Sequence, residues 1–237
     1  MLGPIVNSVC ILIGSVIGTF SGSSITPAFR NKLMYVFSCI TLGIGVSMTA
    51  KGHALPPVII SLLFGTLLGE ALRFEAGVMR LSFWIAGLFP RRKSAGTDLP
   101  AKAFRDQFAV ATVLFCVSGL GIMGAMREGM TGDASLLFIK ALLDLPTAML
   151  FASSVGAVVG VLAAPQFLVQ AAILLAASFV VPLTTPDMLA DFSACGGIIM
   201  LGAGLRQSSL LEVPILSMLP SLIIVMPISY LWTRFPL

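Results

Sequence analysis

Long apolar runs, separated by short polar segments, extend over almost the whole chain and constrain its fold more than any other feature. A helix needs about 20 apolar residues to cross the hydrocarbon core of a bilayer, and eight runs are long enough to be candidates. They span residues 4–22, 33–50, 56–72, 108–126, 135–163, 167–183, 192–205 and 214–232. Only 10% of the 237 residues are charged, too few to cover a soluble domain. The sequence therefore predicts an all-α fold, a polytopic transmembrane helical bundle of about eight spans.

The fifth run, Ser135–Ala163, is the least regular. It is long, contains Lys140 and Asp144, and is interrupted at Pro146. It fits a tilted span, a broken helix or a re-entrant segment, and a re-entrant segment would leave seven spans. The first run is interpreted as a retained span, because no basic residue precedes Arg30 and a signal peptide needs a basic start.

The basic residues predict the orientation. Seven of the 14 lysines and arginines lie between Arg73 and Arg105, and short cytoplasmic loops retain such residues. With this segment inside, ten basic residues face the cytoplasm and three face outward, so both termini are predicted outside. The basic segment lacks the interleaved aromatic residues on which bases stack, and no nucleic-acid partner is expected.

A helix with one wide apolar face is predicted at Glu75–Phe89, directly before the basic run Arg91–Lys93. This pattern is typical of an interfacial helix on the anionic cytoplasmic leaflet. A simple extension of the third span is the alternative.

An internal repeat appears when the chain is shifted by 159 residues. Thr26-Pro27 then falls on Thr185-Pro186, and Leu42-Gly43-x-Gly45 falls on Leu201-Gly202-x-Gly204. Two spans between the repeats would orient them oppositely, as in many secondary transporters, whose sites lie near the midplane; otherwise the repeats are parallel. The predicted division is repeat A (1–73), a cytoplasmic interfacial helix and basic loop (74–106), two central spans (107–164) and repeat B (165–237).

Polar residues inside the spans are the candidates for function, because ionisable groups are costly in the membrane. Lys140 and Asp144 lie four residues apart on one helix face and are expected to pair, as a structural ion pair or as part of a pathway. Asn7 and Gln166 occupy matching positions of the repeats, and Gln170 follows one turn later. These amides either bond neighbouring helices or line a polar site.

Glu70 lies near the cytoplasmic end of the third span, where a surface pair with Arg73 is the alternative to a pathway role. Paired glycines in the second and seventh spans permit either close packing or local unwinding that exposes backbone groups. The candidate substrate or ion pathway comprises Lys140, Asp144, Asn7, Gln166, Gln170, Glu70, Gly43, Gly45, Gly202 and Gly204.

Enzyme and metal signatures are missing from the sequence. His53 is the only histidine, the four cysteines all lie in apolar runs, and no nucleotide-binding, zinc or nucleophile motif occurs. The sequence predicts no cofactor, no metal and no catalytic residue. Intramembrane catalysis by Asp144 and a second acid is the least favoured hypothesis.

Several segments together resemble the YqgA/YdfK family of uncharacterised bacterial inner-membrane proteins, over nearly the whole chain. They are Gly3-Pro4-Ile5-Val6-Asn7, Leu63-Phe64-Gly65-x4-Glu70, the run Gly124–Asp133, Lys140-x3-Asp144, Gln170, and the run Gly196–Leu205. The resemblance implies a multi-pass protein of the inner membrane and supplies no substrate. Leu145-Pro146 departs from the family pattern, which has a glycine after the aspartate, so the helix break here is expected to differ.

Two classes of function follow. The favoured hypothesis is a small secondary transporter or permease for a small solute or ion. The alternative is a non-transporting scaffold or sensor whose basic loop contacts a partner. The predicted partners are the lipid bilayer and a small solute or ion, and a homo-oligomer is compatible with the sequence. A polar cavity that reaches Asp144 would favour transport, whereas a dry bundle with a large cytoplasmic patch would favour the scaffold.

Overall fold

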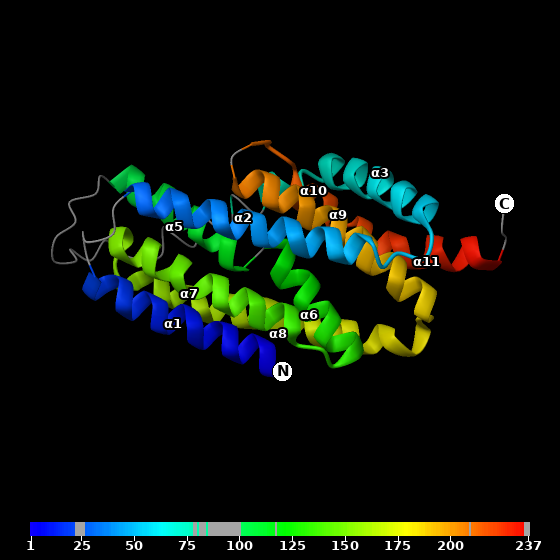
Figure 1. Ribbon diagram of the computed structural model, residues 1–237, viewed down its shortest axis with the longest axis horizontal. Coiled ribbons are helices and arrows are strands. Elements are labelled where there is room, and N and C mark those ends of the chain that lie inside the picture. Colours follow the sequence, from blue (N-terminus) through cyan, green and yellow to red (C-terminus); the bar gives the residue numbers. More distant parts are fainter. Residues whose placement is uncertain are drawn as a thin grey trace. The chain divides into compact units, whose positions relative to one another are not determined.

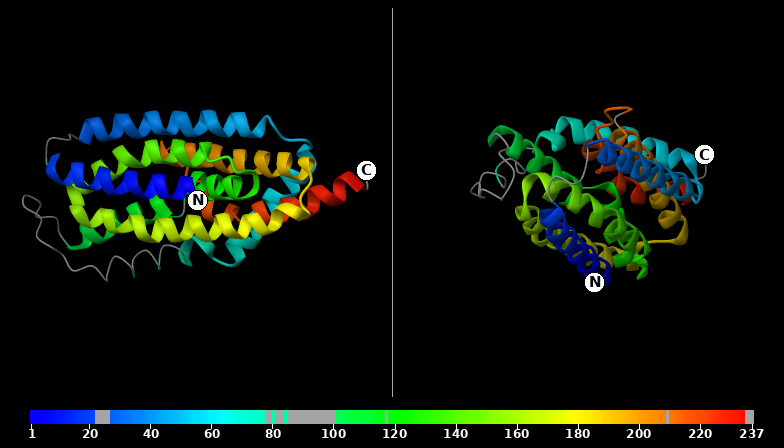
Figure 2. Two further views of the ribbon diagram at one scale, coloured as in Figure 1. Left: turned by 90° about the horizontal axis from the view of Figure 1, so that it is seen from below. Right: turned by 60° about the vertical axis from the view of Figure 1, so that its left-hand side comes forward.

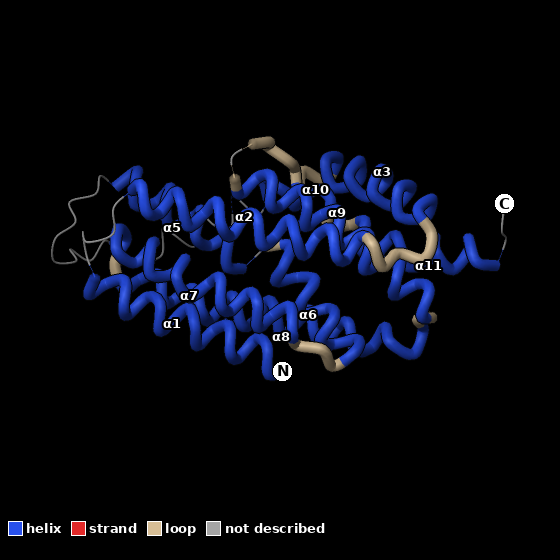
Figure 3. Tube along the Cα trace, viewed as in Figure 1, coloured by secondary structure: helices blue, strands red, loops and turns tan. Residues whose placement is uncertain are grey.

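The computed structural model describes residues 1–21, 27–77, 80, 84, 101–116, 118–208 and 210–234, and every regular element among them is helical (Figure 3). Seven segments are long and apolar enough to cross a membrane, and α3 is a shorter apolar helix of 17 residues. The predicted polytopic all-α fold is confirmed. Most of the predicted interfacial helix at Glu75–Phe89, and the basic run after it, lie outside the described residues.

The chain divides into two compact units. Unit 1 comprises residues 1–32 and 78–179, and unit 2 comprises residues 33–77 and 180–237. The helices of unit 1 are α1 (Leu2–Ser21), α5 (Ala101–Cys116), α6 (Gly119–Thr131), α7 (Ser135–Val155), the 3-10 helix η2 (Ala157–Leu162) and α8 (Ala163–Val180). Those of unit 2 are α2 (Pro27–Thr49), α3 (Leu55–Ala71), the short η3 (Val181–Leu183), α9 (Pro186–Gln207), α10 (Ile215–Met218) and α11 (Ser221–Arg234). Unit 2 thus holds the last two spans of each predicted repeat.

The fourth span is broken, which the sequence analysis did not predict. Helix α5 ends at Cys116, and α6 begins at Gly119. Ser118 has an extended backbone, and its hydroxyl accepts a hydrogen bond of 3.1 Å from the Gly121 N–H. Serine is a strong N-cap, and two glycines in the following turn weaken helix continuation, so a new helix starts here.

The fifth span passes through Pro146 as a continuous helix, so a helix break at this proline does not occur. Helix α7 has 21 residues and passes through Pro146; membrane helices tolerate a proline because neighbouring groups satisfy the freed carbonyl. It ends at Val155 rather than Ala163, because Gly156 adopts a φ of 90° that favours glycine. The sixth span therefore starts earlier than predicted, with η2.

In unit 1, α1 and α7 pack side by side through glycines (Figures 1 and 2). A Cβ at Gly14 would lie 2.2 Å from the Leu145 carbonyl oxygen, and a Cβ at Gly18 would lie 2.2 Å from that of Met149. From the first contact to the second, the residue number rises by four on α1 and by four on α7, so the two helices run parallel. The first and fifth predicted spans therefore have the same direction, as eight alternating spans would require.

In unit 2, the glycine contacts run in the opposite sense. A Cβ at Gly45 would lie 2.9 Å from Leu201 on α9, and a Cβ at Gly204 would lie 2.7 Å from Leu42 on α2. Along these contacts the residue number rises on α2 while it falls on α9, so α2 and α9 are antiparallel. Helix α3 is likewise antiparallel to α10 and α11, because Gly65 faces Ser221 and Gly69 faces Ser217.

Candidate functional site

A buried ion pair lies inside unit 1. The Lys140 Nζ donates to the Asp144 Oδ2 over 2.5 Å, and the side chains are only 2% and 10% exposed. The predicted pairing is confirmed. Helix α7 is shorter than the predicted run Ser135–Ala163, so its centre lies closer to the pair than the centre of that run. The midpoint of α7 is Leu145, so Asp144 lies about 1.5 Å and Lys140 about 7.5 Å from it along the axis.

Three carboxamides on α1 and α8 are buried in the same unit as the pair. Asn7, Gln166 and Gln170 are all at most 1% exposed. The Ser8 hydroxyl donates to the Gln166 Oε1 over 2.8 Å and joins α1 to α8. The Asn7 amide lies next to the Asp144 carboxylate and so joins α1 to α7.

The helix break brings α6 against the same residues. A Cβ at Gly121 would lie 2.8 Å from the Lys140 Cε and 3.1 Å from the Gln170 Nε2. Any larger residue there would displace the lysine or the glutamine, so glycine gives both side chains their space. We call Asn7, Lys140, Asp144, Gln166 and Gln170 the polar cluster; it joins side chains from α1, α7 and α8 beside the start of α6.

Four amide atoms of the polar cluster have no hydrogen-bond partner within the described part of the chain. They are the Asn7 Oδ1, both polar atoms of Gln170, and the Gln166 Nε2. A buried polar atom that lacks a partner costs about 1–3 kcal/mol, and native proteins contain few of them. So many in one place indicate a site that receives hydrogen bonds from something other than the protein.

The remaining candidate residues belong to unit 2 and behave differently. Glu70 is exposed on α3. The four glycines lie within continuous helices, Gly43 and Gly45 in α2 and Gly202 and Gly204 in α9. The local unwinding considered for these glycines does not occur. Gly45 and Gly204 pack against the opposite helix, Gly202 packs against Val213 in the following loop, and Gly43 has no neighbour within 4 Å of an added Cβ.

Two buried carboxylates accept hydrogen bonds from the N–H groups at the starts of helices. The sequence analysis did not identify either of them. Glu128, on α6, accepts the Gly3 N–H at 3.2 Å and the Met1 ammonium at 2.7 Å. Asp191, on α9, is fully buried and accepts the N–H groups of His53 and Ala54 at 2.9 and 2.7 Å. Carboxylates stabilise helix N-termini by meeting free N–H groups and the helix dipole. Their partners are backbone nitrogens of distant segments and, for Asp191, the Ser229 hydroxyl at 2.6 Å. No sequence pattern identifies these partners.

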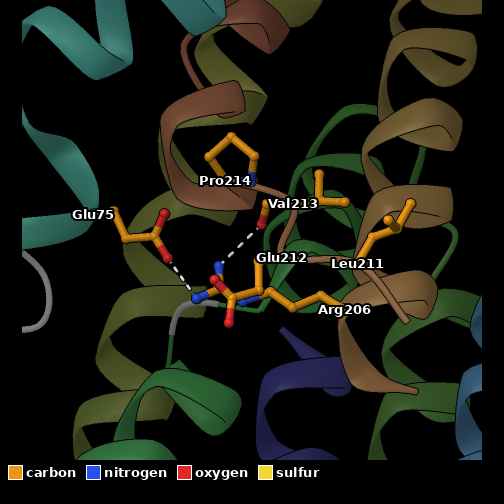
Figure 4. Close-up of a pocket in the computed structure, with 6 residues that line it drawn as sticks. All are labelled: Glu75, Arg206, Leu211, Glu212, Val213 and Pro214. Carbon is orange, nitrogen blue, oxygen red and sulfur yellow. Dashed lines mark hydrogen bonds and ion pairs between the residues drawn. The ribbon is translucent and has the colours of Figure 1, made fainter. Parts of the chain in front are cut away.

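A surface pocket of about 560 Å³ lies in unit 2 (Figure 4). Arg206 lies across it, 2.5 Å from the Glu75 carboxylate and 3.1 Å from the Val213 carbonyl oxygen. Arg206 and Glu75 are 42% and 28% exposed, so this pair faces solvent and differs from the buried one. Its contacts bring the segment after α3 and the loop after α9 to one end of unit 2.

Comparison with known proteins identifies the family. Residues 2–230 match the family model described as a protein of unknown function, DUF554. The chain belongs to the DUF554 family. A relative from Escherichia coli K12, named uncharacterized protein YqgA, is 39% identical over 237 residues and covers 99% of each chain. The uncharacterized membrane protein YdfK of Bacillus subtilis 168 is 28% identical over 228 residues, 94% of this chain and 93% of its own.

The predicted resemblance to YqgA and YdfK is confirmed, and this DUF554 protein is a membrane protein with several apolar spans. No solved structure matches the chain. The family description gives no activity, so the function of this DUF554 member has to be argued from its own residues.

Proposed function

We propose that this protein is a small secondary transporter or permease, and that its solute or ion passes through the polar cluster of unit 1. One observation carries the proposal: four unpartnered amide atoms belong to a polar cluster that also contains a buried ion pair, inside apolar helices. A purely structural cluster would satisfy these atoms within the protein, because each one otherwise destabilises the fold. A site that binds and releases a polar molecule needs such atoms.

The depth of the cluster supports the proposal. Asp144 lies near the middle of α7, and Gln166 and Gln170 flank the midpoint of the span 157–179. Transporter sites lie near the bilayer midplane, next to interrupted helices, and the break before Gly119 starts α6 beside Lys140 and Gln170.

An inverted repeat would fit the same function, and we include it in the proposal. Shifted by 159 residues, Gly45 corresponds to Gly204 and Leu42 corresponds to Leu201. The contact of Gly45 with Leu201 then becomes the contact of Gly204 with Leu42, and both are present between antiparallel helices. This exchange is what a twofold axis in the membrane plane would produce.

The proposed setting is the bacterial inner membrane, with both termini outside. The basic bias supports this orientation. So does the meeting of Arg206 with Glu75, because both flank loops that the bias assigns to the cytoplasm. In unit 1, the Met1–Glu128 contact likewise brings the chain start to the end of α6 that the orientation assigns to the outside.

The test is a flux assay with purified protein in vesicles. Vesicles are loaded in turn with inorganic cations, anions, amino acids, polyols and small amides, and solute movement is followed. We expect at least one class to move faster than in protein-free vesicles, and Asp144→Asn to abolish the gain. Glu75→Gln, in the surface pocket of unit 2, is the control and should retain it. No movement of any class by folded protein would contradict transport.

The scaffold or sensor hypothesis remains the alternative, and the half-exposed Glu75–Arg206 pair beside a pocket favours it. A partner that binds there would need this pair. Two results together would replace transport by the scaffold hypothesis. Vesicles with the parent protein show no flux, and cells that carry Arg206→Ala lose a phenotype that cells with Asp144→Asn keep.

A further inference from the structure

We infer that the polar cluster binds a small uncharged molecule that carries both hydrogen-bond donors and acceptors, such as water, a short polyol or a small amide. This inference rests on the proposed function and names the class of its substrate. It follows from three properties of the cluster: its charge, its free hydrogen-bonding groups and its size.

The charge of the cluster is already balanced. Lys140 and Asp144 hold each other at 2.5 Å with almost no exposure. A net ion would add an unbalanced charge to this buried site, which is strongly unfavourable. A zwitterion would have to separate the pair and replace both partners. An uncharged ligand leaves the pair intact.

The free groups of the cluster are amides of both polarities. Gln170 offers an unpartnered N–H donor and an unpartnered carbonyl acceptor, Asn7 offers an unpartnered carbonyl, and Gln166 offers an unpartnered N–H group. Both polarities are present whichever way each amide is turned. The matching ligand therefore presents acceptors to the N–H groups and O–H or N–H donors to the carbonyls. A simple cation or anion satisfies only one of these sets.

The packing around the cluster requires a small ligand. Gly121 packs tightly against Lys140 and Gln170. A Cβ at this position would lie 2.8 Å from the Lys140 Cε and 3.1 Å from the Gln170 Nε2. Helix α1 approaches α7 so closely that a Cβ at Gly14 would overlap the Leu145 carbonyl. Helices in such contact cannot separate around a bulky solute without breaking these glycine contacts.

The experiment uses stopped-flow light scattering on vesicles containing the purified full chain. Separate arms present a water gradient with impermeant sucrose, glycerol, acetamide, glycine, potassium chloride and sodium acetate. The parent should accelerate one of the uncharged arms, which also identifies the ligand, and leave glycine and the salts at the protein-free rate. Gln170→Met should reduce the accelerated rate about tenfold, because it removes two hydrogen bonds to the ligand. Gln207→Met, an amide change on α9 in unit 2, should leave that rate unchanged.

Thermal unfolding of the same proteins with and without each solute separates the possible failures. Acceleration of glycine or the salts alone overturns the inference and leaves transport standing. No acceleration, with an uncharged solute raising the Tm of the parent but not of Gln170→Met, keeps the binding site and overturns transport. Neither acceleration nor a Tm shift overturns both. If Gln170→Met is not monodisperse, Asn7→Leu is used in its place with the same expected losses.

Discussion

At the scale of single residues, the buried charges are the most constrained feature of this protein. Lys140 and Asp144 tolerate the apolar interior because each neutralises the other. Replacing such a pair by apolar residues is often neutral for stability, whereas removing one partner is not. The pair therefore has a testable signature that separates its structural role from its functional one.

We expect Lys140→Met and Asp144→Ala, taken singly, to reduce the yield of monodisperse protein sharply. Each leaves a buried unpaired charge, which costs about 3–5 kcal/mol, a large part of a typical stability. The double variant should recover the yield but not the flux. The measurement is size-exclusion chromatography of detergent-extracted protein, with the exposed Lys51→Ala as control. Equal yields for both single variants and the parent would mean that the charges are solvated.

At the scale of elements, glycines set how closely the helices approach. Gly43 and Gly45 lie two residues apart on α2, yet only Gly45 faces the backbone of α9. The two positions have the same chemistry and different surroundings. They form a matched pair for testing the antiparallel contact between α2 and α9.

Gly45→Ala should lower the Tm, because its Cβ would lie 2.9 Å from the Gly197 carbonyl oxygen and overpacking costs about 1–3 kcal/mol. Gly43→Ala should leave the Tm unchanged or raise it, since nothing lies within 4 Å of its Cβ and alanine favours a helix by up to about 1 kcal/mol. Thermal unfolding in detergent measures both. Equal shifts for the two variants would contradict the interface between α2 and α9.

The sequence predicted the helices well because lipid leaves the backbone few alternatives to a helix. It also predicted the members of the polar cluster, because polar side chains are rare in apolar runs. It did not predict the break at Ser118, since serine and glycine also occur inside membrane helices. Nor did it identify Gly121, whose importance depends on Lys140 and Gln170 approaching from other helices.

At the scale of the whole molecule, orientation is the property that the sequence predicts most simply. Ten basic residues are assigned inside and three outside, and the retention of basic loops in the cytoplasm is a general rule. The helix directions within each unit agree with eight alternating spans. If the orientation were opposite to the one that the basic residues predict, the cytoplasmic and outer ends of the proposed pathway would be exchanged.

We expect a single cysteine at Ser94 to be protected from an impermeant thiol reagent in intact cells, and one at Arg234 to be labelled. Ser94 lies in the predicted cytoplasmic loop, and Arg234 ends α11 on the predicted outer side. Labelling after cell lysis is the control, and both positions should then react. Labelling at position 94 and protection at position 234 in intact cells would reverse the orientation.

The most direct test of the central claim, that the polar cluster lines a pathway for a polar molecule, is the water accessibility of position 170. Gln170→Cys and Leu168→Cys are made on a cysteine-free background. Leu168 is 66% exposed on the same helix, which suits a residue that faces lipid. Methyl methanethiosulfonate, a small uncharged reagent, reacts with the thiolate and therefore needs water at the thiol.

The account predicts that the cysteine at 170 reacts many times faster than the cysteine at 168 in native membranes, although it is the more buried position. Both should react equally after denaturation. A cysteine at 170 that reacts no faster than the one at 168, in folded protein that reacts fully once denatured, would mean that the cluster is dry and would contradict the pathway.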